Sequence, residues 1–156
     1  MTAATATTPR NSIAFAALTS GAYASAATAL LFLLVDATRG QLLYTPSLLG
    51  QVVLLGGDPA SVEPLRLDMV ALYSLVHLVV FVLIGAAATA LYEAWSLLRV
   101  PMVLGAALMA VLTAGAFSLG AVAYPGLVAA IGPVWLVAGN LAAAGTMAWL
   151  IRSGTR

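Results

Sequence analysis

Residues 67–92 read LDMVALYSLVHLVVFVLIGAAATALY, and no Asp, Glu, Lys or Arg interrupts them after Asp68. The stretch is longer than the roughly 20 helical residues that cross a hydrocarbon core. Comparable apolar stretches cover approximately residues 13–35, 100–124 and 127–151. They are continuously apolar instead of alternating, which favours helices over the strands of a membrane barrel. The sequence therefore predicts an all-α, polytopic membrane protein, a bundle of four transmembrane helices.

The composition supports this class and narrows the function. Hydrophobic residues make up 63% of the chain and charged residues only 7%, with a mean hydropathy of +1.08. Soluble domains carry about 25% charged residues, so lipid must solvate this chain. The sequence has no cysteine, which excludes disulfides and thiolate metal sites. A net charge of +1 argues against nucleic acid as a partner. We expect the lipid bilayer and other membrane protein subunits as partners.

The domain organisation is simple. We expect a polar N-terminal tail over residues 1–12, a transmembrane domain over 13–151 and a short C-terminal tail over 152–156. Between the first two helices, Thr45 and Pro46 are typical of a helix start, and two glycines follow a short apolar run. Residues 46–55 are too few to span a membrane. They predict a helix that lies along the membrane surface, or a re-entrant helix covered by protein.

The arginines predict the orientation. The N-terminal tail, the second loop and the C-terminus share one side and carry Arg10, Arg99, Arg152 and Arg156. The other side carries only Arg39 and Arg66. The positive-inside rule places the arginine-rich side, and with it both termini, in the cytoplasm. All basic residues are arginine and alanine is frequent, which is typical of a GC-rich genome. We therefore expect a multi-pass protein of a bacterial inner membrane.

The first helix carries small residues on one face, among them Gly21 and Ser25. Small residues let the backbones of transmembrane helices approach closely. We expect this face to pack against another helix.

The second helix carries the only histidine of the chain. Ser74, His77, Phe81 and Gly85 share one face, and the opposite face holds only large apolar residues. His77 is therefore expected to point into protein, where polar groups are candidates for function. The leading interpretation is a neutral imidazole hydrogen-bonded across the bundle. The alternatives are proton or substrate handling, and axial ligation of haem or of a chlorophyll magnesium.

Asn140 lies near the middle of the fourth helix, opposite the face that carries Trp135 and Trp149. A buried asparagine most often bonds a neighbouring helix, and that is its expected role here. No Asp or Glu lies in the central part of any predicted helix, which disfavours proton-coupled pumps and exporters. No hydrolase or metalloprotease motif is present. We predict no catalytic residue, no metal site and no enzyme activity.

Three short motifs carry a resemblance to known sequences. They are Thr45-Pro46-Ser47-Leu48-Leu49-Gly50, His77-x3-Phe81-x3-Gly85 and Asn140-Leu141-Ala142-Ala143. In these residues the chain resembles a group of uncharacterised bacterial four-helix membrane proteins, and the likeness covers most of its length. The resemblance implies four helices with an outer segment between the first two. It implies no particular activity.

These observations lead to three functional hypotheses. The first is an accessory, non-catalytic subunit that packs against a larger bacterial membrane complex, such as an electron-transfer or photosynthetic one. The second is a homo-oligomeric channel or small-solute transporter, with a path lined by Tyr73, Ser74, His77 and Asn140. The third is a small haem- or chlorophyll-binding membrane protein that uses His77.

Overall fold

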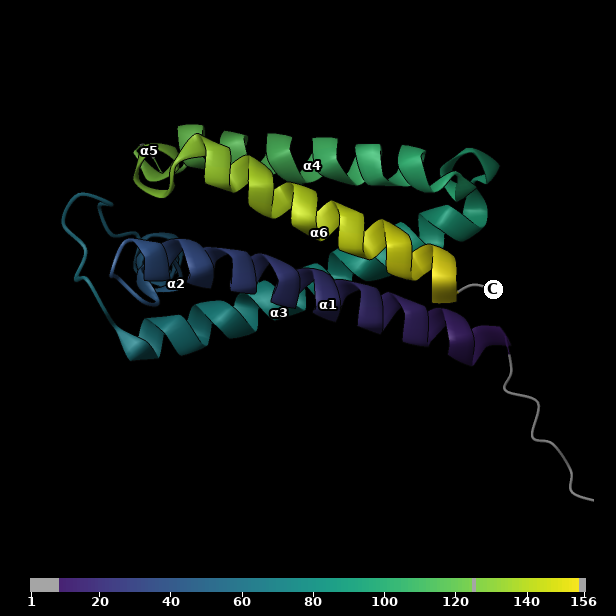
Figure 1. The fold of residues 1–156 in the computed structure, drawn as a ribbon, viewed down its shortest axis with the longest axis horizontal. Helices are drawn as coiled ribbons and strands as arrows, with labels where there is room; N and C mark the ends of the chain where they lie inside the picture. Colours follow the sequence, from purple (N-terminus) through teal and green to yellow (C-terminus); the bar gives the residue numbers. More distant parts are fainter. Residues whose placement is uncertain (1–8, 125, 155–156) are drawn as a thin grey trace, which may run out of the picture.

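The computed structural model describes residues 9–124 and 126–154, and within these every regular element is a helix (Figure 1). The long helices are α1 (Pro9–Thr38), α3 (Leu67–Ala94), α4 (Pro101–Val122) and α6 (Pro133–Gly154). Each contains a segment long and apolar enough to cross a membrane. For the described residues, the prediction of an all-helical fold with four such helices is confirmed.

The long helices pack as a row in the order α3, α1, α6, α4, instead of closing into a ring. Helix α1 packs along both α3 and α6, and α6 packs along both α1 and α4, whereas α3 and α4 barely touch. The row is curved, because residues of α3 and α4 line opposite walls of one cavity. The bundle is thus open between α3 and α4 along this cavity, while nearer the 3₁₀ turn η2 (Ser96–Arg99) residues of both helices belong to one buried cluster.

Two glycines bring α1 and α3 together where they cross. A Cβ atom on Gly21 would collide with the carbonyl oxygen of Phe81, and one on Gly85 would lie 2.8 Å from the carbonyl oxygen of Ala17. Only glycine allows the backbones to approach this closely. The small-residue face of α1 therefore packs on the Gly85 face of α3. From this crossing toward α2, the two helices diverge (Figure 1).

Helix α6 packs on α1 through small residues as well. The hydroxyl of Thr28 donates to the carbonyl oxygens of Ala24 (3.1 Å) and of Gly139 on α6 (3.3 Å). Buried alanines and methionine continue this contact along α6 toward α4. The main core thus lies between the inner faces of all four long helices, and α3 contributes Phe81 and Ala88 to it.

The segment between α1 and α3 folds as α2 (Tyr44–Leu49) followed by a single π-helical turn, η1 (Gly50–Leu54). It runs across the long helices and is seen almost end-on in Figure 1. Leu48 and Val52 are fully buried and pack with Leu127, Ile131 and Leu136. One face of this segment is therefore covered by protein. Its depth relative to a membrane, interfacial or re-entrant, stays a prediction.

The fourth apolar stretch, expected as one helix over 127–151, is divided in two. Helix α5 (Leu127–Ile131) ends at Gly132, which has a φ of +96°, and α6 begins at Pro133. Glycine adopts positive φ without strain, and proline disfavours helical geometry in the residue before it. These two residues together turn the chain, although the apolar character continues through them.

The ends of α1 and α6 also differ from expectation. Helix α1 begins at Pro9, a residue type that a first helical turn accepts, so residues 9–12 are helical and not part of a tail. Helix α6 continues to Gly154, beyond the expected end at Ile151. The remaining tail residues, 1–8 and 155–156, lie outside the described residues.

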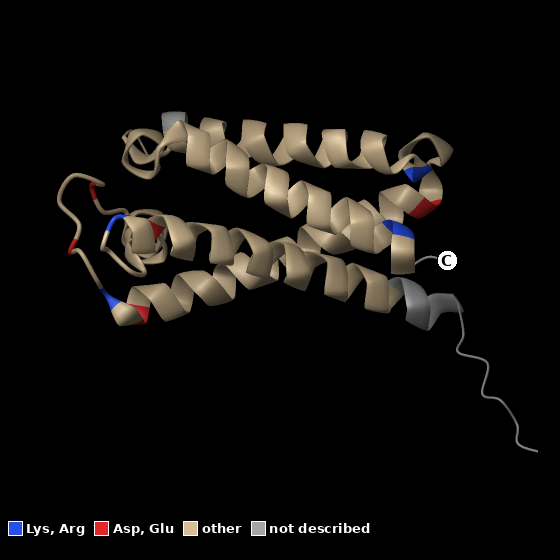
Figure 2. Cartoon of the chain, in the orientation of Figure 1, with Lys and Arg blue, Asp and Glu red and all other residues tan. Residues whose placement is uncertain are grey.

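Charged residues lie at the two ends of the bundle, and none lies along its middle in the described part of the chain (Figure 2). The start of α1, the end of α6 and the 3₁₀ turn η2 (Ser96–Arg99) share one end. Helix α2, the 56–66 loop and the start of α3 share the other. This matches the two predicted sides, while the assignment of one side to the cytoplasm stays a prediction.

Candidate ligand-binding groove

A cavity of about 490 Å³ lies between α3 and α4, and we call it the α3–α4 groove. Residues of α3 such as Val76 and Val80 line one wall, and residues of α4 such as Val111 and Gly115 line the other. Helices α1 and α6 form the floor, and α2, η1 and α5 close one end. The volume is within the range of small-molecule binding sites.

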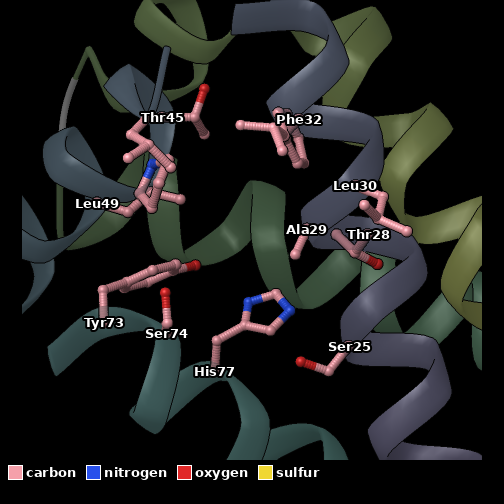
Figure 3. Close-up of a pocket in the computed structure, with 13 residues that line it drawn as sticks. Ser25, Thr28, Ala29, Leu30, Phe32, Thr45, Leu49, Tyr73, Ser74 and His77 are labelled. Atoms are coloured by element: carbon pink, nitrogen blue, oxygen red, sulfur yellow. The ribbon is translucent and has the colours of Figure 1, made fainter. Parts of the chain in front are cut away.

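A second, smaller cavity of about 230 Å³ lies between α1, α2 and α3, where α1 and α3 diverge (Figure 3). We call it the α1–α3 cavity. It shares five lining residues with the groove, namely Thr28, Phe32, Leu49, Tyr73 and His77. The two spaces therefore meet at the face of α3 that carries His77.

The lining of both cavities is mostly apolar, with a few uncharged polar side chains. In the groove these are Thr28, Tyr73, His77 and Asn140. Among the described residues, no Asp, Glu, Lys or Arg lines either cavity. Apolar walls with a few placed polar groups are typical of sites for hydrophobic ligands.

His77 is held in place by aromatic rings on its own helix. Its ring stacks on Phe81, with centroids 4.4 Å apart and an interplanar angle of 10°, and it lies 5.7 Å from the ring of Tyr73 at a 60° tilt. The spacing of four residues places these three rings on one face of α3. Figure 3 shows the imidazole pointing from α3 toward Thr28 and Ala29 of α1.

The buried nitrogen Nε2 of His77 has no hydrogen-bond partner among the described residues. The hydrogen bond across the bundle that we expected for this imidazole is therefore not formed. A buried polar atom left without a partner costs about 1–3 kcal/mol. Because His77 lines both cavities, a bound molecule could supply the hydrogen-bond partner that the described part of the protein does not.

The other predicted residues on this face are placed as follows. Ser74 lies on α3 beside His77, and Ser25 lies across the α1–α3 cavity on α1 (Figure 3). Neither hydroxyl forms a hydrogen bond within the described part of the chain. Gly21 and Gly85 take no part in the cavities and serve the α1–α3 contact instead.

Asn140 connects α6 with α4 and also lines the groove. Its Nδ2 donates to the hydroxyl of Thr113 at 3.4 Å, which is a hydrogen bond to a neighbouring helix of the expected kind. The Thr113 hydroxyl donates in turn to the sulfur of Met109 at 3.7 Å. The rest of the Asn140 amide remains available to the groove.

Sequence reasoning missed the role of Asp36, which lies just beyond the predicted first helix (residues 13–35). Asp36 is fully buried, and its two oxygens accept hydrogen bonds from the backbone N–H and the hydroxyl of Thr45, both at 2.7 Å. Thr45 is consequently not the N-cap residue. Leu43 occupies that position with a φ of 66°, and the Asp36 carboxylate caps α2 in its place.

Gln51 and Ser47 fasten the far side of the same segment. The side-chain amide of Gln51 pairs with the backbone of Glu63, donating to its oxygen at 2.9 Å and accepting from its N–H at 3.0 Å. The hydroxyl of Ser47 accepts the N–H of Arg66 at 2.9 Å. Because these partners lie 12 and 19 residues apart in the sequence, no local sequence pattern predicts these hydrogen bonds.

Two further contacts seat η1 in the groove. The hydroxyl of Tyr124 donates to the carbonyl oxygen of Val53 at 3.0 Å. A Cβ atom on Gly50 would lie 2.6 Å from the carbonyl oxygen of Met69, so η1 packs backbone to backbone on α3. The segment from α2 to η1 is thus wedged between α3 and the α4–α5 connection.

Comparison with protein families, with curated proteins and with solved structures finds no match. The resemblance to uncharacterised four-helix membrane proteins stays a prediction. The fold and the site together define a class. It is an all-helical protein whose long helices can span a membrane and which holds an apolar groove with a few uncharged polar groups.

Proposed function

We propose that this is a multi-pass membrane protein that binds a hydrophobic small molecule in the α3–α4 groove, with Tyr73 and His77 as polar contacts. The observation that supports it is His77, whose imidazole forms no hydrogen bond within the described residues and which lines a cavity of ligand size. We further propose a bacterial inner membrane as its location, with both termini in the cytoplasm, on the strength of the arginine distribution.

The position of the groove suits a ligand that arrives from lipid. Segment α2–η1 and helix α5 close one end of the groove, and α1 and α6 close its floor. The remaining side lies between α3 and α4, which barely touch. A molecule dissolved in the bilayer would enter sideways between these two helices. A solute channel is less well supported, because a path through the groove would meet the α2–η1 segment.

The accessory-subunit hypothesis is a second candidate, and the exposure of α4 favours it. Only 11% of the membrane-length segment of α4 is buried within the protein, against 39% for α6. A larger membrane complex that covers α4 would also cover one lip of the groove. A subunit that carries a hydrophobic ligand into such a complex would satisfy both proposals.

The test is purification in a mild detergent, followed by native mass spectrometry and chemical extraction. We expect a hydrophobic molecule to remain bound in a fixed ratio to the protein. His77→Leu should reduce its occupancy, while Val79→Ile, on an exposed part of α3, should leave it unchanged. Circular dichroism verifies that both variants are folded. A protein that retains nothing beyond bulk lipid would contradict the proposal.

A further inference from the structure

Resting on the proposed function, we infer that the groove takes a lipid-soluble quinone-type molecule: an uncharged ring with carbonyl oxygens and an alkyl or isoprenoid tail. The ring lies where the two cavities meet, beside Tyr73 and His77. The tail lies along the groove and leaves between α3 and α4. Charge, hydrogen-bonding capacity, ring contacts and groove length each support this class.

The lining requires an uncharged head group. Among the described residues, neither cavity is lined by a charged side chain, so nothing there balances a phosphate or a carboxylate. An unpaired charge in apolar surroundings is strongly disfavoured. Phospholipids and fatty acids therefore fit this lining poorly, whereas a neutral polar ring fits it.

The polar groups present are donors that suit carbonyl oxygens. The hydroxyl of Tyr73 forms no hydrogen bond within the described part of the chain, and the imidazole of His77 has none either. Asn140 offers an amide from α6, across the groove from α3. Phenol, imidazole and amide groups can each donate a hydrogen bond to a carbonyl oxygen. A ring with carbonyls on opposite edges can use donors from α3 and from α6.

Aromatic side chains around these donors favour a flat ring. Phe32, Tyr73 and Phe81 line the groove, and the imidazole of His77 is already stacked on Phe81. Flat rings gain about 0.5–1.5 kcal/mol from such contacts beyond the burial of their area.

The length and the wall chemistry of the groove suit a tail. Lining residues of α3 extend from Tyr73 to Ile84, which at 1.5 Å per residue is about 16 Å. Beyond His77 these residues are Val80, Phe81 and Ile84, and α4 contributes Val111 and Leu112 opposite them. An alkyl or isoprenoid chain would bury its surface against these side chains.

The test uses the fact that His77 is the only histidine of the chain. Protein labelled with ¹⁵N-histidine, carrying a histidine-free tag, is placed in phosphatidylcholine nanodiscs and titrated with a short-tailed ubiquinone or menaquinone analogue. We expect the imidazole nitrogen signals to shift in a saturable way with one analogue per protein. Cholesterol, diacylglycerol and zinc protoporphyrin are titrated in parallel as competing classes.

Variants distinguish hydrogen bonding from metal ligation. His77→Asn and His77→Gln place an amide near one or the other ring nitrogen, and at least one should keep quinone affinity within a few-fold, measured with a radiolabelled analogue. His77→Leu should weaken it roughly tenfold, as expected for one hydrogen bond. Tyr73→Phe should weaken it severalfold.

The outcomes separate this inference from the proposed function. If the quinones give no saturable shift but another class does, the proposed function stands and the quinone assignment is wrong. If only the porphyrin binds, and both amide variants lose it, His77 is a metal ligand. If no class binds and no molecule copurifies, both proposals are wrong.

Discussion

Asp36 and Thr45 show how a single pair of residues fixes the outer part of the chain. The carboxylate is fully buried, and Thr45 donates to both of its oxygens from its backbone and its hydroxyl. Both hydrogen bonds are short and join residues nine positions apart in the sequence. The pair therefore ties the start of α2 to the last turns of α1.

Thr45→Val tests this pair at the level of one hydroxyl. Valine keeps the shape and the backbone N–H but leaves one buried carboxylate oxygen without its donor, so we expect a loss of about 1–3 kcal/mol in the free energy of unfolding. Unfolding by SDS in detergent micelles measures it. Thr38→Val, which removes a hydroxyl bonded only to the Val35 carbonyl, is the control and should change stability by less than about 0.5 kcal/mol. Equal effects in the two variants would refute the assigned role.

At the level of elements, the contact between α1 and α3 depends on glycine. Gly21 and Gly85 let the two backbones touch, and any side chain there meets backbone atoms that cannot move aside. The crossing also sets how far the helices diverge toward α2, and hence the width of the α1–α3 cavity.

Gly85→Val should separate α1 from α3. Overpacking of this kind costs about 1–3 kcal/mol or more, and we expect a lower unfolding midpoint in the same SDS titration. Gly145→Ala on α6 is the control, because a Cβ atom there meets nothing within 4 Å. It should leave stability unchanged or raise it by up to about 1 kcal/mol through helix propensity. A valine at position 85 without effect would show that the helices do not approach as described.

The α2–η1 segment gives a second prediction for this scale. Gln51→Leu removes both hydrogen bonds to the Glu63 backbone, so we expect faster amide exchange in residues 50–66, measured by hydrogen–deuterium exchange mass spectrometry. Exchange within α6 should not change. Ser61→Ala, on the exposed part of the same loop, should leave the whole pattern as it was. Unchanged exchange in the Gln51 variant would mean that this pairing does not hold the loop.

The elements also show what a sequence can and cannot reveal. The long helices are predictable because apolar length alone defines them, and the face of α3 that carries His77 follows from helical spacing. The glycine–proline pair at residues 132 and 133 could have predicted the break between α5 and α6. The apolar stretch continues through both residues, however, and therefore predicts one helix. The cover over α2 and η1 is not predictable, since it depends on Glu63, Tyr124 and α5, far along the chain. That Nε2 of His77 has no hydrogen-bond partner in the described part of the chain could not be predicted, because it depends on how α1, α3 and α6 pack against one another.

At the scale of the whole molecule, charged residues mark the two ends of the bundle, and the part between them is apolar. The two ends would lie on opposite sides of a membrane. The described acidic and basic residues lie at the ends of the bundle, and the α3–α4 groove lies between these ends. Because the sequence has no cysteine, any cysteine that is introduced becomes the only thiol.

Thiol labelling tests the predicted orientation. In intact bacterial spheroplasts, Ser61→Cys in the α2-side loop should react with a membrane-impermeant maleimide, and Ser153→Cys near the end of α6 should not. After detergent permeabilisation both should react. The opposite pattern would reverse the orientation expected from the arginines.

The off-centre position of the groove has one more consequence. Its polar residues lie toward the α2 end: Tyr73 is about 9 Å along α3 from that end and Asn140 about 10 Å along α6, at 1.5 Å per residue. The polar end of the groove would therefore lie within a single leaflet. A molecule whose ring lies in the opposite monolayer would have to cross the bilayer before it binds, so the rate of this crossing would limit how fast ligand reaches the protein.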